Sequence, residues 1–321
     1  MQQWRAIQRH NFTDWKQLCD FLELDSAYHN EVLDATHFPL NLPTRIAKKI
    51  TKNCWKDPIL RQFLPTQRET LSHPLFTLDP VKDQQYRTTS KLLHKYQGRA
   101  LLVCTSACAM NCRFCFRQNF DYDKHVKGFE DEIRAIQQDP SLKEILLSGG
   151  DPLSLSNNAL RQLIKQLGQI PHLTRLRFHS RFPIGIPERI DSEFLEILQN
   201  TRLQVFFVIH CNHPRELDED IFAALNKLQR AGCPVLSQTV LLKGVNDTLE
   251  ILRTLFETLV DHGILPYYLH QLDRVRGTTH FEVPLEEGRQ LVAALRAHLP
   301  GYAVPDFVAE IPDLPSKTPL C

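Results

Sequence analysis

The sequence predicts an α/β protein in which parallel strands alternate with helices to form an incomplete β/α barrel. Six apolar runs of strand-like length recur after residue 99, each separated from the next by an amphipathic stretch with helical spacing. Continuous apolar strands are typical of parallel sheets that are covered on both faces. Six strand–helix units can curve into a partial (β/α)6 barrel, while an open, doubly wound sheet is the alternative that periodicity alone leaves open.

The predicted elements divide the chain into three parts. Residues 1–95 are interrupted by prolines and carry short stretches with helical spacing, so we expect a helical N-terminal extension there. The barrel core spans 96–300, and a short C-terminal tail covers 301–321. The expected strands are residues 99–105, 144–150, 173–180, 203–210, 234–242 and 265–272. The expected helices are residues 129–138, 157–167, 191–199, 217–232, 247–263 and 284–299.

Composition and charge exclude several classes of protein. The formal net charge of +1 supplies no basic field, so neither a nucleic-acid partner nor a membrane partner is expected. No apolar run approaches the roughly 20 residues that span a bilayer, and residues 1–12 lack the apolar core of a signal peptide. Only three of the nine cysteines form a tight cluster. The others are scattered as free thiols would be in a reducing compartment, and we therefore expect a cytoplasmic protein without a disulfide framework.

The three clustered cysteines are the most informative residues of the chain. Cys108, Cys112 and Cys115 are separated by three and then two residues. A structural zinc site normally has four protein ligands, and a zinc ribbon would need a second pair of ligands that this sequence lacks. An iron–sulfur cluster held by three cysteines leaves one iron free to bind another molecule. The spacing therefore favours a reactive iron–sulfur cluster over a zinc ribbon or a set of buried thiols.

Polar residues follow the predicted strands at the points where the strands end. Because chemistry gathers at the carboxyl ends of parallel strands, we expect these residues to form one site. The glycines in this set allow a backbone to approach a ligand closely. In strand order, the set is the cysteine loop, then Gly149, Gly150 and Asp151, then Ser180 and Arg181, then His210, Gln238 and Asp273.

These motifs together resemble the radical S-adenosylmethionine superfamily. The segments CAMNCRFCFR and LLSGGDPL carry the superfamily pattern. The segments HCNHPREL, SQTVLLKGVND, PYYLHQLD and PSKTP are similar to the lysine 2,3-aminomutase family, over about residues 99–319. The resemblance implies that the three cysteines bind a 4Fe–4S cluster whose free iron holds S-adenosylmethionine. It also implies S-adenosylmethionine contacts from Gly149, Gly150, Asp151, His210 and Gln238.

The resemblance further implies pyridoxal 5'-phosphate and an amino-acid substrate. Lys317 corresponds to the family's pyridoxal lysine, and Arg99 to a position that binds the cofactor phosphate. This chain reads IPDLPSK where the family carries glycines before the lysine. Arg117 corresponds to the arginine that binds the substrate carboxylate. Asp273 and Glu310 correspond to the two acids that hold a distal ammonium, and an acid at both positions favours a basic amino acid.

The implied activity is that of an isomerase, converting L-lysine to (R)-β-lysine by a 1,2-amino shift with an external electron donor. The PSKTPL ending and short tail resemble the bacterial enzyme that supplies β-lysine for translation elongation factor P, to which a separate ligase attaches it. The alternatives are a metabolic aminomutase for lysine or another amino acid, and a non-catalytic iron–sulfur module. The sequence leaves a homo-oligomer open, as it does the choice between Glu310 and nearby Asp313.

Overall fold

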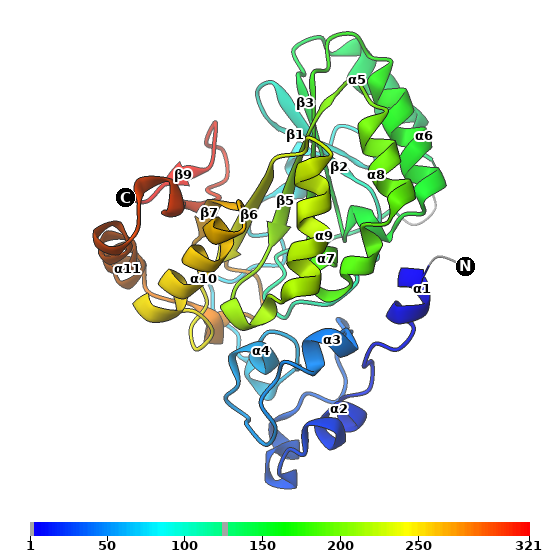
Figure 1. Ribbon diagram of the computed structural model, residues 1–321. Helices are drawn as coiled ribbons and strands as arrows, with labels where there is room; N and C mark the ends of the chain where they lie inside the picture. The colour runs from blue at the N-terminus through cyan, green and yellow to red at the C-terminus, as the bar shows by residue number, and fades with distance from the viewer. Residues whose placement is uncertain (1–2, 124–127) are drawn as a thin grey trace.

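The computed structural model describes residues 3–123 and 128–321 as an α/β fold built on one open sheet (Figure 1). Within the described residues, nine strands join this sheet in the order β1 to β9. Strands β2 to β8 run parallel, whereas β1 and β9 pair antiparallel at the two edges. The strands are β1 (Leu92–Tyr96), β2 (Arg99–Val103), β3 (Glu144–Ser148), β4 (Arg175–Ser180), β5 (Gln204–His210), β6 (Val235–Val240), β7 (Leu265–His270), β8 (Asp306–Ala309) and β9 (Thr318–Pro319).

The strand order confirms the partial barrel. A doubly wound sheet reverses its strand order at a switch point, whereas here the spatial order follows the chain throughout. The six predicted strands correspond to β2 through β7. A seventh parallel strand, β8, and the two antiparallel edge strands were not predicted, because each is short and has no helix-flanked apolar run. Within the segment expected to form a tail after 300, Asp306–Ala309 and Thr318–Pro319 pair with the sheet.

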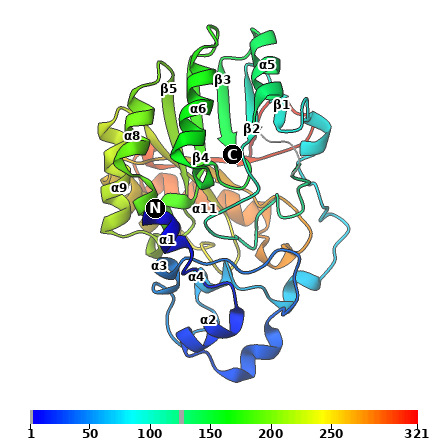
Figure 2. The ribbon, with the colours of Figure 1, turned by 90° about the vertical axis from the view of Figure 1, so that its right-hand side faces the viewer.

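The six predicted helices form at their expected places and lie against the sheet (Figure 2). In α6 the apolar side chains Leu160, Leu163, Ile164 and Leu167 are buried on one face, and the Ser156 side chain caps the helix by accepting from the Ala159 amide. The helices of the core are α5 (Glu130–Gln138), α6 (Asn157–Gly168), α7 (Phe182–Gly185), α8 (Ser192–Gln199), α9 (Glu219–Arg230), α10 (Leu249–Asp261) and α11 (Leu285–His298).

The first 90 residues form short helices joined by irregular segments. They lie at the end of the sheet toward which the parallel strands run (Figure 1). The helical spacing at 14–24 produces α2, but that at 42–54 produces only a single turn, α3. The helices are α1 (Gln3–Gln8), α2 (Trp15–Leu22), α3 (Thr44–Ala47) and α4 (Pro58–Arg61).

Among the described residues, no helix combines the length and apolar character that crossing a bilayer requires.

The N-terminal segment holds the cysteine loop through backbone and side-chain contacts. The Asn111 amide donates to the Asn41 carbonyl at 2.9 Å, and the Arg113 amide donates to the Gln62 carbonyl at 2.9 Å. The Arg113 guanidinium, itself 1% exposed, forms a two-point ion pair with Glu69. Paired guanidinium–carboxylate contacts fix geometry as well as charge. The segment therefore acts as a brace for the loop that carries the cysteines.

The Gly149–Gly150 turn supports the same loop from the other side. The Gly150 amide donates to the Thr105 carbonyl at 2.6 Å. Gly149 has a φ of +117°, and a Cβ at Gly150 would lie 2.4 Å from the Ala107 carbonyl oxygen. A side chain at position 150 would therefore clash with the backbone at Ala107, and only glycine fits there. The structure thus gives these glycines a neighbour that the sequence did not predict, the backbone that leads into Cys108.

Replacing Gly150 with alanine should displace the cysteine loop. We expect G150A to lower the free energy of unfolding by about 1–3 kcal/mol, as overpacking typically does, and to lower the iron and sulfide bound per chain after reconstitution. The matched control is G168A, since a Cβ there meets only Thr201 Oγ1 at 3.7 Å. Urea unfolding and iron analysis test this. Iron content in G150A equal to that of G168A would contradict the role assigned to the turn.

Candidate active site

The three cysteines lie in the loop after β2 and act electrostatically on one another. Burial raises the pKa of the Cys108 thiol, and the neighbouring Asp151, Cys115 and Cys112 raise it further. Burial, followed by Cys112, raises the pKa of Cys115 to about 11. Among the described residues, no three His, Cys, Asp or Glu side chains gather closely enough to hold a single metal ion. Three cysteines are the protein ligands of a four-iron cluster with one open iron, whereas a structural zinc site normally takes four protein ligands.

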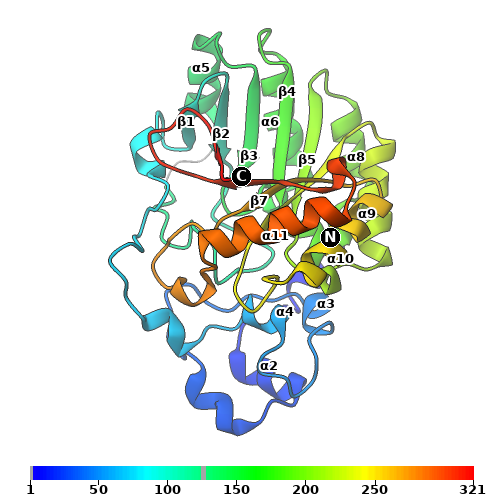
Figure 3. The same cartoon turned by 90° about the vertical axis from the view of Figure 1, so that its left-hand side faces the viewer.

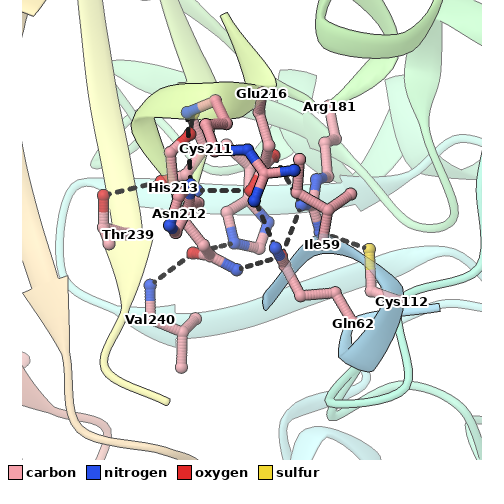
Figure 4. A network of polar contacts seen from close by, with 12 residues as sticks. Ile59, Gln62, Cys112, Arg181, Cys211, Asn212, His213, Glu216, Thr239 and Val240 are labelled. Carbon is pink, nitrogen blue, oxygen red and sulfur yellow. Dashed lines mark hydrogen bonds and ion pairs between the residues drawn. The ribbon is translucent and has the colours of Figure 1, made fainter. Parts of the chain in front are cut away.

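A buried polar network holds Cys112 (Figure 4). Arg181 Nη1 donates to Cys112 Sγ at 2.8 Å, and Arg181 Nη2 contacts both Glu216 Oε2 and Gln62 Oε1 at 2.7 Å. Glu216 and Gln62 are completely buried. Burial raises the pKa of the Cys112 thiol, and Arg181 partly offsets that effect. A cation donating to this sulfur favours its thiolate form, which is the form that binds metal.

Asp151 joins the ends of β3 and β4. Its carboxylate accepts from Ser180 Oγ at 2.8 Å, from the Arg181 amide at 2.9 Å and from the Phe182 amide at 3.0 Å. Burial raises the pKa of Asp151 to about 6, while these hydrogen bonds oppose the rise. Asp151 therefore sets the position of Arg181, and through it that of Cys112.

The predicted His210 and Gln238 lie side by side on β5 and β6. They are directly paired in the sheet register. Burial, followed by the charge of Arg181, lowers the pKa of His210 to about 3, so its ring is neutral. Two further strand-end histidines act on this group. Burial lowers the pKa of His179, and burial followed by the charge of Lys317 lowers the pKa of His270.

Lys317 lies just before β9 and forms an ion pair with Glu310. Its Nζ is 2.6 Å from Glu310 Oε2. The other oxygen, Oε1, accepts from Lys95 Nζ at 2.8 Å and from the Tyr96 hydroxyl at 2.7 Å. Burial alone would raise the pKa of Glu310, but Lys317 and Lys95 hold it well below its usual range. The Arg99 guanidinium stacks on the Tyr96 ring at 4.7 Å. Lys317 and Lys95 thus share one carboxylate, and Arg99 lies over the ring of the tyrosine that donates to it.

Arg117 forms a buried ion pair with Asp83. Arg117 Nε donates to Asp83 Oδ2 at 2.8 Å, and Nη1 donates to Ser148 Oγ at 3.2 Å. Asp83 lies in a single turn, η3 (Asp83–Tyr86), of the N-terminal segment. The position of Asp83 orients the Arg117 guanidinium, which is predicted to bind a substrate carboxylate.

Asp273 and Glu310 line one cavity of about 750 Å³ at the ends of β7 and β8. The Asp273 side chain has no hydrogen bond or ion pair with the described residues. Burial raises the pKa of Asp273 to about 7, although nearby Lys317 lowers it. Asp313 does not reach this cavity. It is half-exposed and accepts from Lys82 Nζ at 2.6 Å and the Tyr86 hydroxyl at 2.8 Å.

Several functional side chains escaped the sequence reasoning. Lys95, Asp83, His179 and His270 each act on a residue that was predicted. Lys95 sits on an unpredicted edge strand, and Asp83 in an irregular turn, so neither had a position in a pattern. His179 and His270 lie at the ends of β4 and β7 as His210 lies at the end of β5, and this shared position is the signal that could have found them.

Comparison with known proteins identifies the family. The family described as the radical SAM superfamily matches residues 102–255. The L-lysine 2,3-aminomutase of Escherichia coli (strain K12) is 42% identical over 286 residues, covering 88% of this chain and 83% of that protein. The L-lysine 2,3-aminomutase of Haemophilus influenzae is 38% identical over 321 residues, covering 99% and 95%.

A solved structure agrees on the fold. A radical SAM methyltransferase from Sphaerobacter thermophilus superimposes with a TM-score of 0.50 at 18% identity, covering 68% of each chain. Identity this low supports the fold alone. The sequence relatives carry the assignment further, because they are similar over most of their length and of this one. The chain belongs to the radical SAM superfamily and, within it, to the L-lysine 2,3-aminomutase family of isomerases.

Proposed function

We propose that the protein converts free L-lysine to (R)-β-lysine, using S-adenosylmethionine on a 4Fe–4S cluster together with pyridoxal phosphate on Lys317. The observation that carries the proposal is the arrangement at the barrel mouth. The Lys317 amine and the Asp273 carboxylate lie there, and Asp83 acts electrostatically on Asp273 while it pairs with Arg117. Arg117 in turn acts on Cys115 of the cysteine loop. When bound, the cofactors supply hydrogen-atom abstraction and a temporary covalent hold on the migrating nitrogen.

The residues around Lys317 fit a pyridoxal phosphate site. Lys317 offers a primary amine that is one-quarter exposed. Lys95 and Arg99 place two further cations beside it, and the Tyr268 ring lies 5.9 Å from its Nζ. Cations and an aromatic face suit a phosphorylated pyridine ring. These side chains would provide the contacts to the cofactor phosphate that the family's glycines before the lysine provide, since this chain lacks those glycines.

Asp273 is the residue that would select a basic substrate. Its carboxylate faces the cavity without a partner, whereas Glu310 already neutralises two lysines. Glu310 lines the same cavity and would help Asp273 to hold the substrate ammonium. Arg117, oriented by Asp83, would hold the substrate carboxylate at the other end. A carboxylate at one end and an ammonium at the other match lysine.

Anaerobic turnover assays test the assignment. With S-adenosylmethionine, pyridoxal phosphate and a reductant, the enzyme should produce β-lysine from L-lysine and none from L-glutamate. D273N should raise the KM for lysine by about tenfold or more, as loss of a charge-assisted contact does. The matched control D306N, at the exposed start of β8, should behave as wild type. Absence of β-lysine, or turnover of glutamate, would overturn the proposal.

The pKa of Asp273 predicts how lysine binding depends on pH. Only the ionised carboxylate attracts an ammonium, and with a pKa of about 7 its ionised fraction grows as pH rises. The lysine ammonium stays charged throughout this range. We therefore expect the KM to fall by about tenfold between about pH 6 and pH 8. Steady-state assays should show this slope in the wild type and its loss in D273N. The same pH dependence of the KM in D273N would show that a group other than Asp273 titrates.

We further propose that the β-lysine is passed to a ligase that modifies translation elongation factor P. The support is the resemblance of the PSKTPL segment to that of the bacterial enzyme that supplies β-lysine for this factor. A cytoplasmic location accords with nine free cysteines. Coupling the enzyme to the ligase should increase the mass of elongation factor P by one lysyl group, and use of α-lysine alone would contradict this role.

A further inference from the structure

A second pocket, separate from the cavity with Asp273, holds two arginines without partners. Arg61 ends α4, and Arg68 lies in the single turn η2 (Gln67–Thr70). Both line a pocket of about 30 Å³ together with His280 of η7 (Thr279–Phe281). A single water needs about 10–15 Å³ of such space. The pocket therefore has room for one small ion and none for a substrate.

The two arginines of this pocket lack a directly paired counter-charge among the described residues. Within the described residues, neither guanidinium has a hydrogen bond or an ion pair. Burial lowers the pKa of Arg61, and the charge of Arg68 lowers it further, with only Asp247 opposing. Keeping two like charges together, one of them half-buried, costs free energy unless an anion compensates them. The arrangement points to a missing negative ligand.

The position of Arg61 is built into the fold. Gly244 has a φ of +71°, and a Cβ at that position would collide with the Arg61 guanidinium. The absence of a side chain there makes the room that the arginine occupies. A side chain placed in this way, with no protein partner at its charged end, is arranged for a ligand.

A third polar side chain, that of His280, lines the same pocket beside apolar residues. His280 Nδ1 is buried and has no hydrogen-bond partner among the described residues. Burial, followed by the charges of Arg68 and Arg61, lowers the pKa of His280 to about 4, so the neutral ring can donate one N–H. Leu60 and Phe281 form apolar walls, and contacts to a charge are stronger beside such walls than in water.

We propose that Arg61, Arg68 and His280 bind a small tetrahedral oxyanion, phosphate or sulfate. The planar guanidinium fork matches the oxygens of such an anion. Gln62, the residue after Arg61, contacts Arg181 in the network that holds Cys112. A bound oxyanion therefore also braces the segment that supports the cysteine loop.

Titration of the anaerobically purified, cluster-containing protein tests the site. At constant ionic strength, phosphate and sulfate should each raise the melting temperature above that in chloride, and acetate should not. R68Q should weaken phosphate binding by at least about tenfold, measured by calorimetry, as loss of a charge-assisted pair does. Arg68 is exposed and has no partner, so its replacement leaves the fold intact.

The variant R99Q separates this pocket from the expected cofactor phosphate site. Phosphate binding at Arg61 and Arg68 should persist in R99Q and be lost in R68Q. The reverse pattern, or equal stabilisation by chloride, would overturn the proposal. Equal binding of acetate would overturn it too, because the pocket would then be a carboxylate site rather than one for tetrahedral anions.

Discussion

The Glu310 carboxylate links the two edges of the open sheet, because side chains from both edges contact it. Lys95 and Tyr96 belong to β1 at one edge, and Lys317 precedes β9 at the other. Among the described residues, no strand pairing joins β1 to β9 in the open sheet (Figure 3), and side-chain contacts to Glu310 bridge the two edges instead. Breaking a buried ion pair by removing one partner typically costs about 3–5 kcal/mol. The same contact that joins the edges thus places the Lys317 amine at the barrel mouth.

The cluster side of the mouth depends on the N-terminal segment. Glu69, Gln62 and Asn41 all contact the cysteine loop, directly or through Arg181. Without them, the loop would keep its contacts with β2, with the glycine turn after β3 and with Arg181, but it would lose its support from this part of the N-terminal segment. An irregular segment without an obvious chemistry of its own therefore determines where the cysteines lie. Asp83, from the same segment, extends this control to Arg117.

The sequence predicted what periodicity and spacing encode, and missed what tertiary contacts decide. The strands β2 to β7 and the cysteine loop follow from apolar runs and motif spacing. Strand β8 is four residues long, and nothing in its local sequence distinguishes it from a loop. The ion pairs of Glu310 with both Lys95 and Lys317 could not be predicted either, because Lys95 lies more than two hundred residues before Glu310 in the sequence. The resemblance to a family supplied Lys317, whose surroundings alone would have suggested a solvated lysine.

Reductive labelling tests directly whether Lys317, beside the edge strand β9, binds the pyridoxal phosphate. The holoenzyme with bound pyridoxal phosphate is reduced with borohydride, digested and analysed by mass spectrometry. The account predicts a single pyridoxyl group on Lys317, absent in K317R. A pyridoxyl group on Lys95 or on another lysine, in protein that still produces β-lysine, would contradict it.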